Sequence, residues 1–311
     1  MTSKRCELRK YGLAWLLLVA GCQPKTEPIQ EEQNPPEGSV RHGAAAVNRC
    51  GFIVKNPTPV SINVVGSGFF VRTAGADPAT YYVTARHCVS ALRETLERAK
   101  CLFLCIQKRD GTAACMQLPV DAATYPYWEH VNPAVDLAVF KLVWNEAASD
   151  VLDIRPFEIT ESGGEVLRKA DFGDYVVVGT DVLIYGTVPE LRNQIFGLDD
   201  SPLILTRGMV AALPHSHLQY ENNRRVNLIA VDGTVSHGAS GAAVVRMRED
   251  PQGNKLPVLV GVVSSFVQGR GIMAPDKRLL FRENTGVTLV IPTDYLFEIL
   301  FDASKRQIAV L

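Results

Sequence analysis

Several features that would assign a protein to a simple class are missing from this 311-residue chain. No apolar run approaches the roughly 20 residues that a membrane-spanning helix requires. The chain has no long basic run and a formal net charge of −1, so nucleic acid is not an expected partner. No sequence repeat at a short fixed period is present. The 47% of hydrophobic residues instead fits a globular protein with a core.

The N-terminus has the layout of an export signal, because lysines and arginines precede an apolar run over 11–20. That run ends in Leu18–Cys22, which resembles a bacterial lipobox. The pattern predicts a lipoprotein signal peptide over 1–21 and a lipid such as palmitate on Cys22. We therefore expect an exported protein, anchored by lipid to the bacterial cell envelope at the outer membrane or periplasmic face. An ordinary signal peptide with a chance cysteine is the alternative.

Residues 22–46 are rich in proline, glutamate and glutamine and contain little to bury, which predicts a disordered tether. After it, over 47–311, short apolar or alternating runs are broken by turn residues, as is typical of antiparallel strands. Short helices are predicted over 91–100 and 295–301. The pattern alone therefore predicts a mostly β domain.

Three short segments of this domain contain the residue types that acyl transfer requires. They are Thr84–Cys88, Asp136–Val139 and Gly238–Gly241. Acylation of a hydroxyl at neutral pH needs a base, an anion that holds the base, and amides that receive the developing oxyanion.

Each segment supplies one of these parts. We predict that His87 is the base, Asp136 the orienting carboxylate and Ser240 the nucleophile, with the N–H groups of Gly238 and Ser240 as the oxyanion hole. Asp121 is a competing carboxylate, but it lacks the Leu-Ala-Val sequence that follows Asp136.

These segments resemble those of the trypsin-like serine peptidases, specifically the bacterial branch with the HtrA-type protease domain. Thr-Ala-x-His-Cys, Asp-Leu-Ala-Val and Gly-x-Ser-Gly are all present, although Ala242 stands where the family usually has a second glycine. Gly66–Val71 resembles the strand that leads to the histidine. Leu289–Pro292 and residues 293–300 resemble the last strand and closing helix. The resemblance covers residues 47–302.

The resemblance implies a fold of two antiparallel six-stranded β-barrels with a boundary at about 150–170 and a short C-terminal helix. The active site would lie in the cleft between the barrels. It also implies a domain that acts on polypeptides and needs no cofactor or metal. From the length of the chain we expect no appended PDZ domain. The alternative is a catalytically silent or partner-activated lipoprotein that serves as a binding module.

One departure from the family concerns the residue before the nucleophile. Digestive trypsin-type enzymes have an aspartate there, which pairs with a new N-terminus, whereas this chain has Ala239. The loop that includes Gly238 must therefore be held by local packing, by substrate or by an activating partner.

The resemblance also places the substrate pocket, for which we predict Thr234, His237, Ser264 and Phe266 as lining residues. No acidic residue lies between Thr234 and Ser240, so lysine or arginine is not the favoured substrate side chain. Phe266 near the pocket mouth favours small or medium apolar side chains. His237 could instead contact an acidic one, or simply face solvent.

Removal of the signal peptide and lipidation of Cys22 would leave an odd number of cysteines, so at least one has no intramolecular partner. The family's usual bridge to Cys88 cannot form because residues 62–71 contain no cysteine. We predict a Cys105–Cys115 disulfide across the turn at 110–111. The Cys-x3-Cys spacing of Cys101 and Cys105 lacks the second pair that a zinc site needs.

Overall fold

The computed structural model describes residues 49–58, 61–75, 78–99, 101–107, 113–119, 127–142, 154–187, 203–213, 218–220, 224–273 and 279–309. The predicted signal peptide, Cys22, the tether and Asp121 lie outside these residues. All of the described residues belong to one unit of the chain, Glu37–Leu311. No helix within the described ranges is long and apolar enough to span a membrane.

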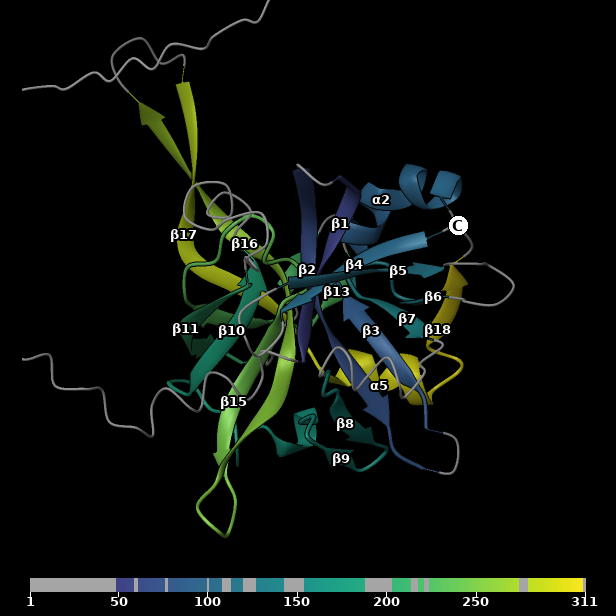
Figure 1. Cartoon of the computed structure of the whole chain (residues 1–311). Helices are drawn as coiled ribbons and strands as arrows, with labels where there is room; N and C mark the ends of the chain where they lie inside the picture. Colours follow the sequence, from purple (N-terminus) through teal and green to yellow (C-terminus); the bar gives the residue numbers. More distant parts are fainter. Residues whose placement is uncertain are drawn as a thin grey trace, which may run out of the picture. The chain divides into compact units, whose positions relative to one another are not determined.

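The first half is built on a ten-stranded sheet, in which eight strands follow the order β18-β6-β7-β3-β2-β1-β4-β5 (Figure 1). β8 pairs in parallel with β2, and β9 pairs with β8. The strands are β1 (Cys50–Thr58), β2 (Ser61–Thr73), β3 (Thr80–Thr84), β4 (Cys101–Gln107), β5 (Ala113–Pro119), β6 (Tyr127–His130), β7 (Ala138–Leu142), β8 (Phe157–Thr160), β9 (Gly163–Gly164) and β18 (Arg306–Ala309).

β3 and the helix that follows it determine where the first half presents its polar residues. β3 reads Thr-Tyr-Tyr-Val-Thr, and these β-branched and aromatic residues are all buried between β2 and β7. Helix α2 (Arg86–Ala99) begins two residues later. Its Cys88, Val89 and Leu92 are buried in the core of this half, at the spacing of one helix face. The chain is therefore fixed on both sides of His87.

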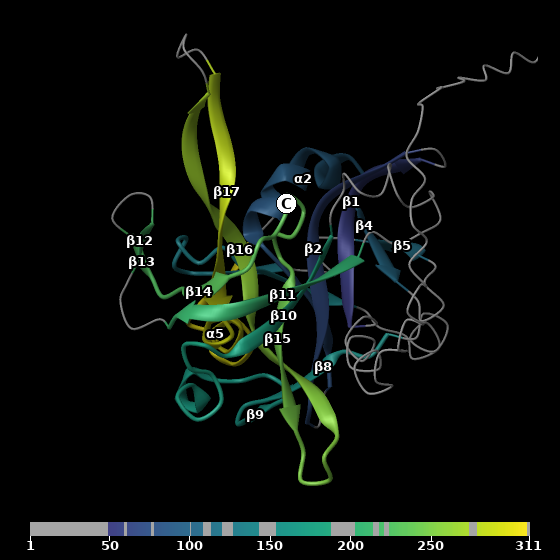
Figure 2. The same ribbon diagram turned by 90° about the vertical axis from the view of Figure 1, so that its left-hand side faces the viewer.

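The second half is a closed barrel in which the strands follow the order β10-β11-β14-β17-β16-β15. The β16–β17 ribbon projects beyond this barrel in both views (Figures 1 and 2). β12 and β13 form a separate pair, and η1 is a 3₁₀ turn before β10. The bounds are η1 (Lys169–Asp171), β10 (Asp181–Thr187), β11 (Leu203–Ala212), β12 (Leu218–Tyr220), β13 (Arg224–Val226), β14 (Ile229–Asp232), β15 (Ala243–Glu249), β16 (Lys255–Met273) and β17 (Leu279–Pro292).

After the barrel, the chain returns to the first half. Helix α5 (Asp294–Phe301) buries four apolar side chains, and β18 then pairs antiparallel with β6. His130 at the end of β6 is buried, and its Nε2 lies 2.7 Å from Oε2 of Glu298 on α5. The last part of the chain therefore completes the sheet that the first part began.

The mostly β fold, the six-stranded barrel and the short C-terminal helix are confirmed. The first sheet has ten strands where six were predicted: seven come from the first part of the chain, and β8, β9 and β18 join from later parts. The predicted helix at 91–100 begins earlier, at Arg86, because its first turns pack against the core.

Among the described cysteines, Cys50 and Cys88 are free and buried, whereas Cys105 is disulfide-bonded. Cys115 lies directly opposite Cys105 in the β4–β5 register. The Cys115 side chain lies outside the described part of the structure, so the pairing of these two residues stays a prediction.

We expect peptide mapping without reduction to find Cys105 linked to Cys115. Cys105→Ser should lower the free energy of unfolding by about 3 kcal/mol, because the bridge restricts the unfolded chain. Denaturation with and without reductant measures this loss. Reductant should destabilise the wild type but not the variant, and a link from Cys105 to any other cysteine would contradict the pairing.

Candidate active site

The structure brings together the three residues predicted to perform the chemistry. His87 lies in the first turn of α2, Asp136 in the segment before β7, and Ser240 in the turn between β14 and β15. Val135 and Leu137 on either side of Asp136 are fully buried. Burial of these apolar neighbours fixes the backbone and directs the carboxylate out of the core towards His87.

Asp136 accepts three hydrogen bonds. Its Oδ2 lies 2.6 Å from Nδ1 of His87, and its Oδ1 accepts the backbone N–H of the same residue at 2.9 Å. The hydroxyl of Ser264 donates to Oδ2 at 2.9 Å. These contacts fix both the position and the ring orientation of His87, and they leave its Nε2 away from Asp136.

The pair shifts the titration of both groups. The hydrogen bond with Asp136 is the main reason why the pKa of His87 lies above its usual value; Cys88 adds to the shift and desolvation opposes it. Burial alone would raise the pKa of Asp136, but the hydrogen bonds from His87 and Ser264 help to bring it below its usual value. Asp136 is therefore ionised at neutral pH, and His87 gains affinity for a proton.

Ser240 is joined to this pair through Ser264. The Ser240 hydroxyl donates to the Ser264 carbonyl at 3.3 Å, and no hydrogen bond of the described residues joins it to His87. Hydrogen bonds of this kind often tighten only when substrate is present.

The turn around Ser240 has the predicted features of an oxyanion hole. Gly238 and Gly241 have φ angles of 91° and 86°, which only glycine adopts readily. Within the described residues, the N–H groups of Gly238 and Ser240 donate to no acceptor, so both are available to a ligand. A Cβ on Gly241 would lie 2.2 Å from the Ser67 carbonyl, so no larger residue fits there.

The predicted pocket residues divide into two groups. Thr234 and His237 are exposed, and the His237 ring contacts the Phe266 ring edge to face, with centroids 5.3 Å apart. The Ser264 hydroxyl donates to Asp136, so it helps to hold that carboxylate. The sequence analysis missed this role, for which the only signal was the presence of a serine in β16.

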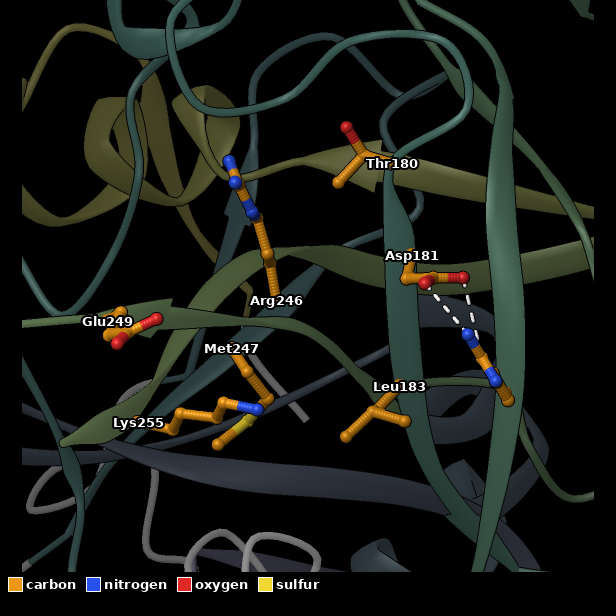
Figure 3. Close-up of a pocket in the computed structure, with 8 residues that line it drawn as sticks. Thr180, Asp181, Leu183, Arg246, Met247, Glu249 and Lys255 are labelled. Carbon is orange, nitrogen blue, oxygen red and sulfur yellow. Dashed lines mark hydrogen bonds and ion pairs between the residues drawn. The ribbon is translucent and has the colours of Figure 1, made fainter. Parts of the chain in front are cut away.

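A separate open pocket of about 450 Å³ lies on the barrel and includes none of the predicted site residues (Figure 3). Arg207 on β11 and Asp181 on β10 form an ion pair at its edge, with an N–O distance of 2.8 Å. Both side chains are largely exposed. The other lining residues are Thr180, Leu183, Arg246, Met247, Glu249 and Lys255.

The raised pKa of His87 predicts how the stability of the folded protein depends on pH. Because His87 binds its proton more tightly in the folded protein, the pair adds stability below about pH 6.5, the usual histidine pKa, and this is lost as pH rises through the higher folded pKa. NMR titration of the His87 ring should give a pKa above 6.5. Asp136→Asn should lower that pKa markedly, because the Asp136 contact is the main cause of the shift. An unchanged value in Asp136→Asn would contradict the assignment.

Solved structures that match this chain include the MamO protease domain from Magnetospirillum magneticum, at 16% identity and a TM-score of 0.47. The match covers 83% of this chain and 98% of that one. Deg5 matches at 18% identity and a TM-score of 0.48, over 88% and 99% of the two chains. The HtrA-type protease AlgWS227A with tripeptide matches at 17% identity and a TM-score of 0.46. That match covers 86% of this chain but 64% of the other.

No curated protein is similar enough in sequence to count as a relative. A sequence profile of the trypsin-like peptidase domain, in contrast, matches residues 66–251, which is more than half of the chain. The match includes all three segments that contain His87, Asp136 and Ser240. The chain belongs to the family of trypsin-like peptidase domains.

Proposed function

We propose that the protein is a serine endopeptidase of the bacterial cell envelope that hydrolyses peptide bonds through an acyl-enzyme. Membership of the peptidase family supports the reaction class. The observation that carries the proposal is the 2.6 Å contact of His87 Nδ1 with Asp136, because it reserves Nε2 for proton transfer with Ser240.

In the proposed reaction, His87 in its neutral form takes the proton of the Ser240 hydroxyl at Nε2 as Oγ attacks the substrate carbonyl carbon. The carbonyl oxygen becomes an anion facing the N–H groups of Gly238 and Ser240. When the C–N bond breaks, His87 gives its proton to the departing amine. Water then attacks the acyl-enzyme by the same route and restores Ser240. Asp136 stays ionised and stabilises the protonated His87 that each step creates.

Substrate would bind as an extended strand beside β16, whose backbone next to Ser264 can form main-chain hydrogen bonds. His237 and Phe266 are in ring contact, and in this proposal they would narrow the approach to the primary pocket. We therefore propose a preference for small or medium apolar side chains.

A fluorophosphonate probe tests the chemistry, because it reacts only with an activated serine. We expect the wild type to be labelled and Ser240→Ala to be unlabelled. His87→Ala should reduce peptide hydrolysis by several orders of magnitude, and the double variant should be scarcely worse than either single, since the residues act as a unit. Circular dichroism should show that all variants remain folded.

One observation favours a second function, that of a silent binding module. Within the described residues, the Ser240 hydroxyl donates to the Ser264 carbonyl and not to His87, so it is not aligned to transfer its proton to the base. On this reading, no condition would yield labelling at Ser240, while polypeptide would still bind beside β16. Peptide binding without labelling therefore selects the binding module, and labelling that depends on Ser240 selects the enzyme.

We also propose that lipid on Cys22 holds the protein at the membrane. The support is the basic flank, the apolar run and the Leu-Val-Ala-Gly-Cys sequence at 18–22. A tether over 22–46 would then separate the peptidase domain from the bilayer.

Cys22→Ser should abolish incorporation of radiolabelled palmitate, because no thiol remains at the acylation site. The unprocessed precursor should accumulate, as seen by its larger mass on gels. Cys50→Ser serves as the control, since a buried cysteine should leave lipid incorporation unchanged. Normal processing and membrane fractionation of Cys22→Ser would disprove the lipobox assignment.

A further inference from the structure

The carbonyl of Gly238 is held by two buried hydroxyl groups from distant parts of the chain. Ser67 Oγ donates to it at 2.7 Å, and Thr187 Oγ1 donates to it at 3.1 Å. Ser67 lies on β2 of the sheet and Thr187 at the end of β10 of the barrel, and both residues are fully buried. A carbonyl oxygen has two lone pairs, so these two donors saturate it.

The two hydroxyls are themselves fixed. The backbone N–H of Thr187 donates to Ser67 Oγ at 3.0 Å. The single proton of Ser67 has its nearer acceptor in the Gly238 carbonyl, because Thr187 Oγ1 lies 3.5 Å away. The Ser67 carbonyl accepts the Thr84 hydroxyl at 2.7 Å, and the Ser67 N–H donates to the Ser240 carbonyl at 2.8 Å. Ser67 therefore donates to two carbonyls of the turn around Ser240, those of Gly238 and Ser240.

The held carbonyl lies between the two groups that would receive the oxyanion. It belongs to the peptide group joining Gly238 to Ala239, and the N–H of that group donates to the Ser236 carbonyl at 3.2 Å. Both ends of this peptide plane are thus fixed. Turning it would leave buried hydroxyls without an acceptor, which costs free energy. The plane in turn limits how the N–H groups of Gly238 and Ser240 can rotate.

Ala239 cannot supply this restraint, because its side chain has no polar group. It is buried, and a Cβ added to Gly186 would lie 3.1 Å from the Ala239 Cβ. The side of the loop that faces β10 is therefore filled by close packing.

We propose that Ser67 and Thr187 are positioning residues that hold the oxyanion loop in its competent form through the Gly238 carbonyl. They act through this loop and do not touch substrate. The proposal rests on the proposed peptidase function. In this proposal the loop is restrained by hydroxyl groups of the chain itself and does not need an activating partner to hold it.

The test uses the full chain and compares Thr187→Val, which loses the hydroxyl, with Thr187→Ser, which keeps it. Thr187→Val and Ser67→Ala should each lower kcat about tenfold or more, with a small change in KM, because misaimed N–H groups weaken only the transition state. Affinity for a peptide boronate should fall by the same factor as kcat/KM. Thr187→Ser should restore most of both. The double variant should lose less than the product of the single losses, since both act on one carbonyl.

Thr293→Val is the matched structural control. Thr293 is also fully buried, and its hydroxyl donates to the carbonyls of Leu167 and Val260, away from the loop. This variant should lower the melting temperature without lowering kcat. If Thr187→Val loses stability but keeps its kcat and boronate affinity, the proposal is overturned.

NMR separates this proposal from the proposed function. If the wild type is never labelled by the fluorophosphonate, the peptidase assignment fails, but the Gly238 amide signal still reports the loop. That signal should be single in the wild type and Thr187→Ser, and broadened or doubled in Thr187→Val. An unchanged, single signal in Thr187→Val would disprove the restraint, whatever the activity.

Discussion

The candidate site depends on a backbone contact between the two halves of the fold. β2 approaches the turn around Ser240 so closely that the N–H of Ser67 donates to the Ser240 carbonyl at 2.8 Å. Glycine is required on both sides of this contact. A Cβ on Gly241 would collide with the Ser67 carbonyl, and a Cβ on Gly66 would lie 2.4 Å from the Cys88 sulfur. Because neither glycine has a side chain, the turn around Ser240 can lie directly against β2 and helix α2.

The residues around this contact differ in how far the sequence revealed them. His87, Asp136 and Ser240 could be predicted because each lies in a short contiguous motif whose neighbours have their own structural reasons. The residues after Asp136 are buried, and glycines bracket Ser240 where φ is positive. Ser67 and Thr187 could not be found in this way. Ser67 lies in a segment that resembled a family strand, but nothing in the sequence pointed to its contact with Gly238. Thr187 lies 120 positions away, and only the folded chain brings the two hydroxyls to the same carbonyl.

The same distinction applies to the fold. Alternating apolar runs predicted strands, and the family resemblance predicted the barrel that the structure contains. The size of the first sheet was not predictable, because edge strands join according to where the chain returns. β8 adds in parallel beside β2, and β18 adds beside β6 from the far end of the chain. The start of α2 was missed because helix periodicity could be recognised only after His87, while the buried first turn extends the helix back to Arg86.

The pairing of β18 with β6 has a consequence for the order in which the protein can be made. During synthesis the barrel emerges between the two parts of the first sheet, so β6 must wait for the last residues before its free edge is covered. Contacts between such distant segments fold slowly, because a long loop must close before they form. Until the C-terminal segment arrives, the sheet that holds His87 is incomplete. A chain interrupted late in translation would thus contain all three candidate catalytic residues and still have an open strand edge.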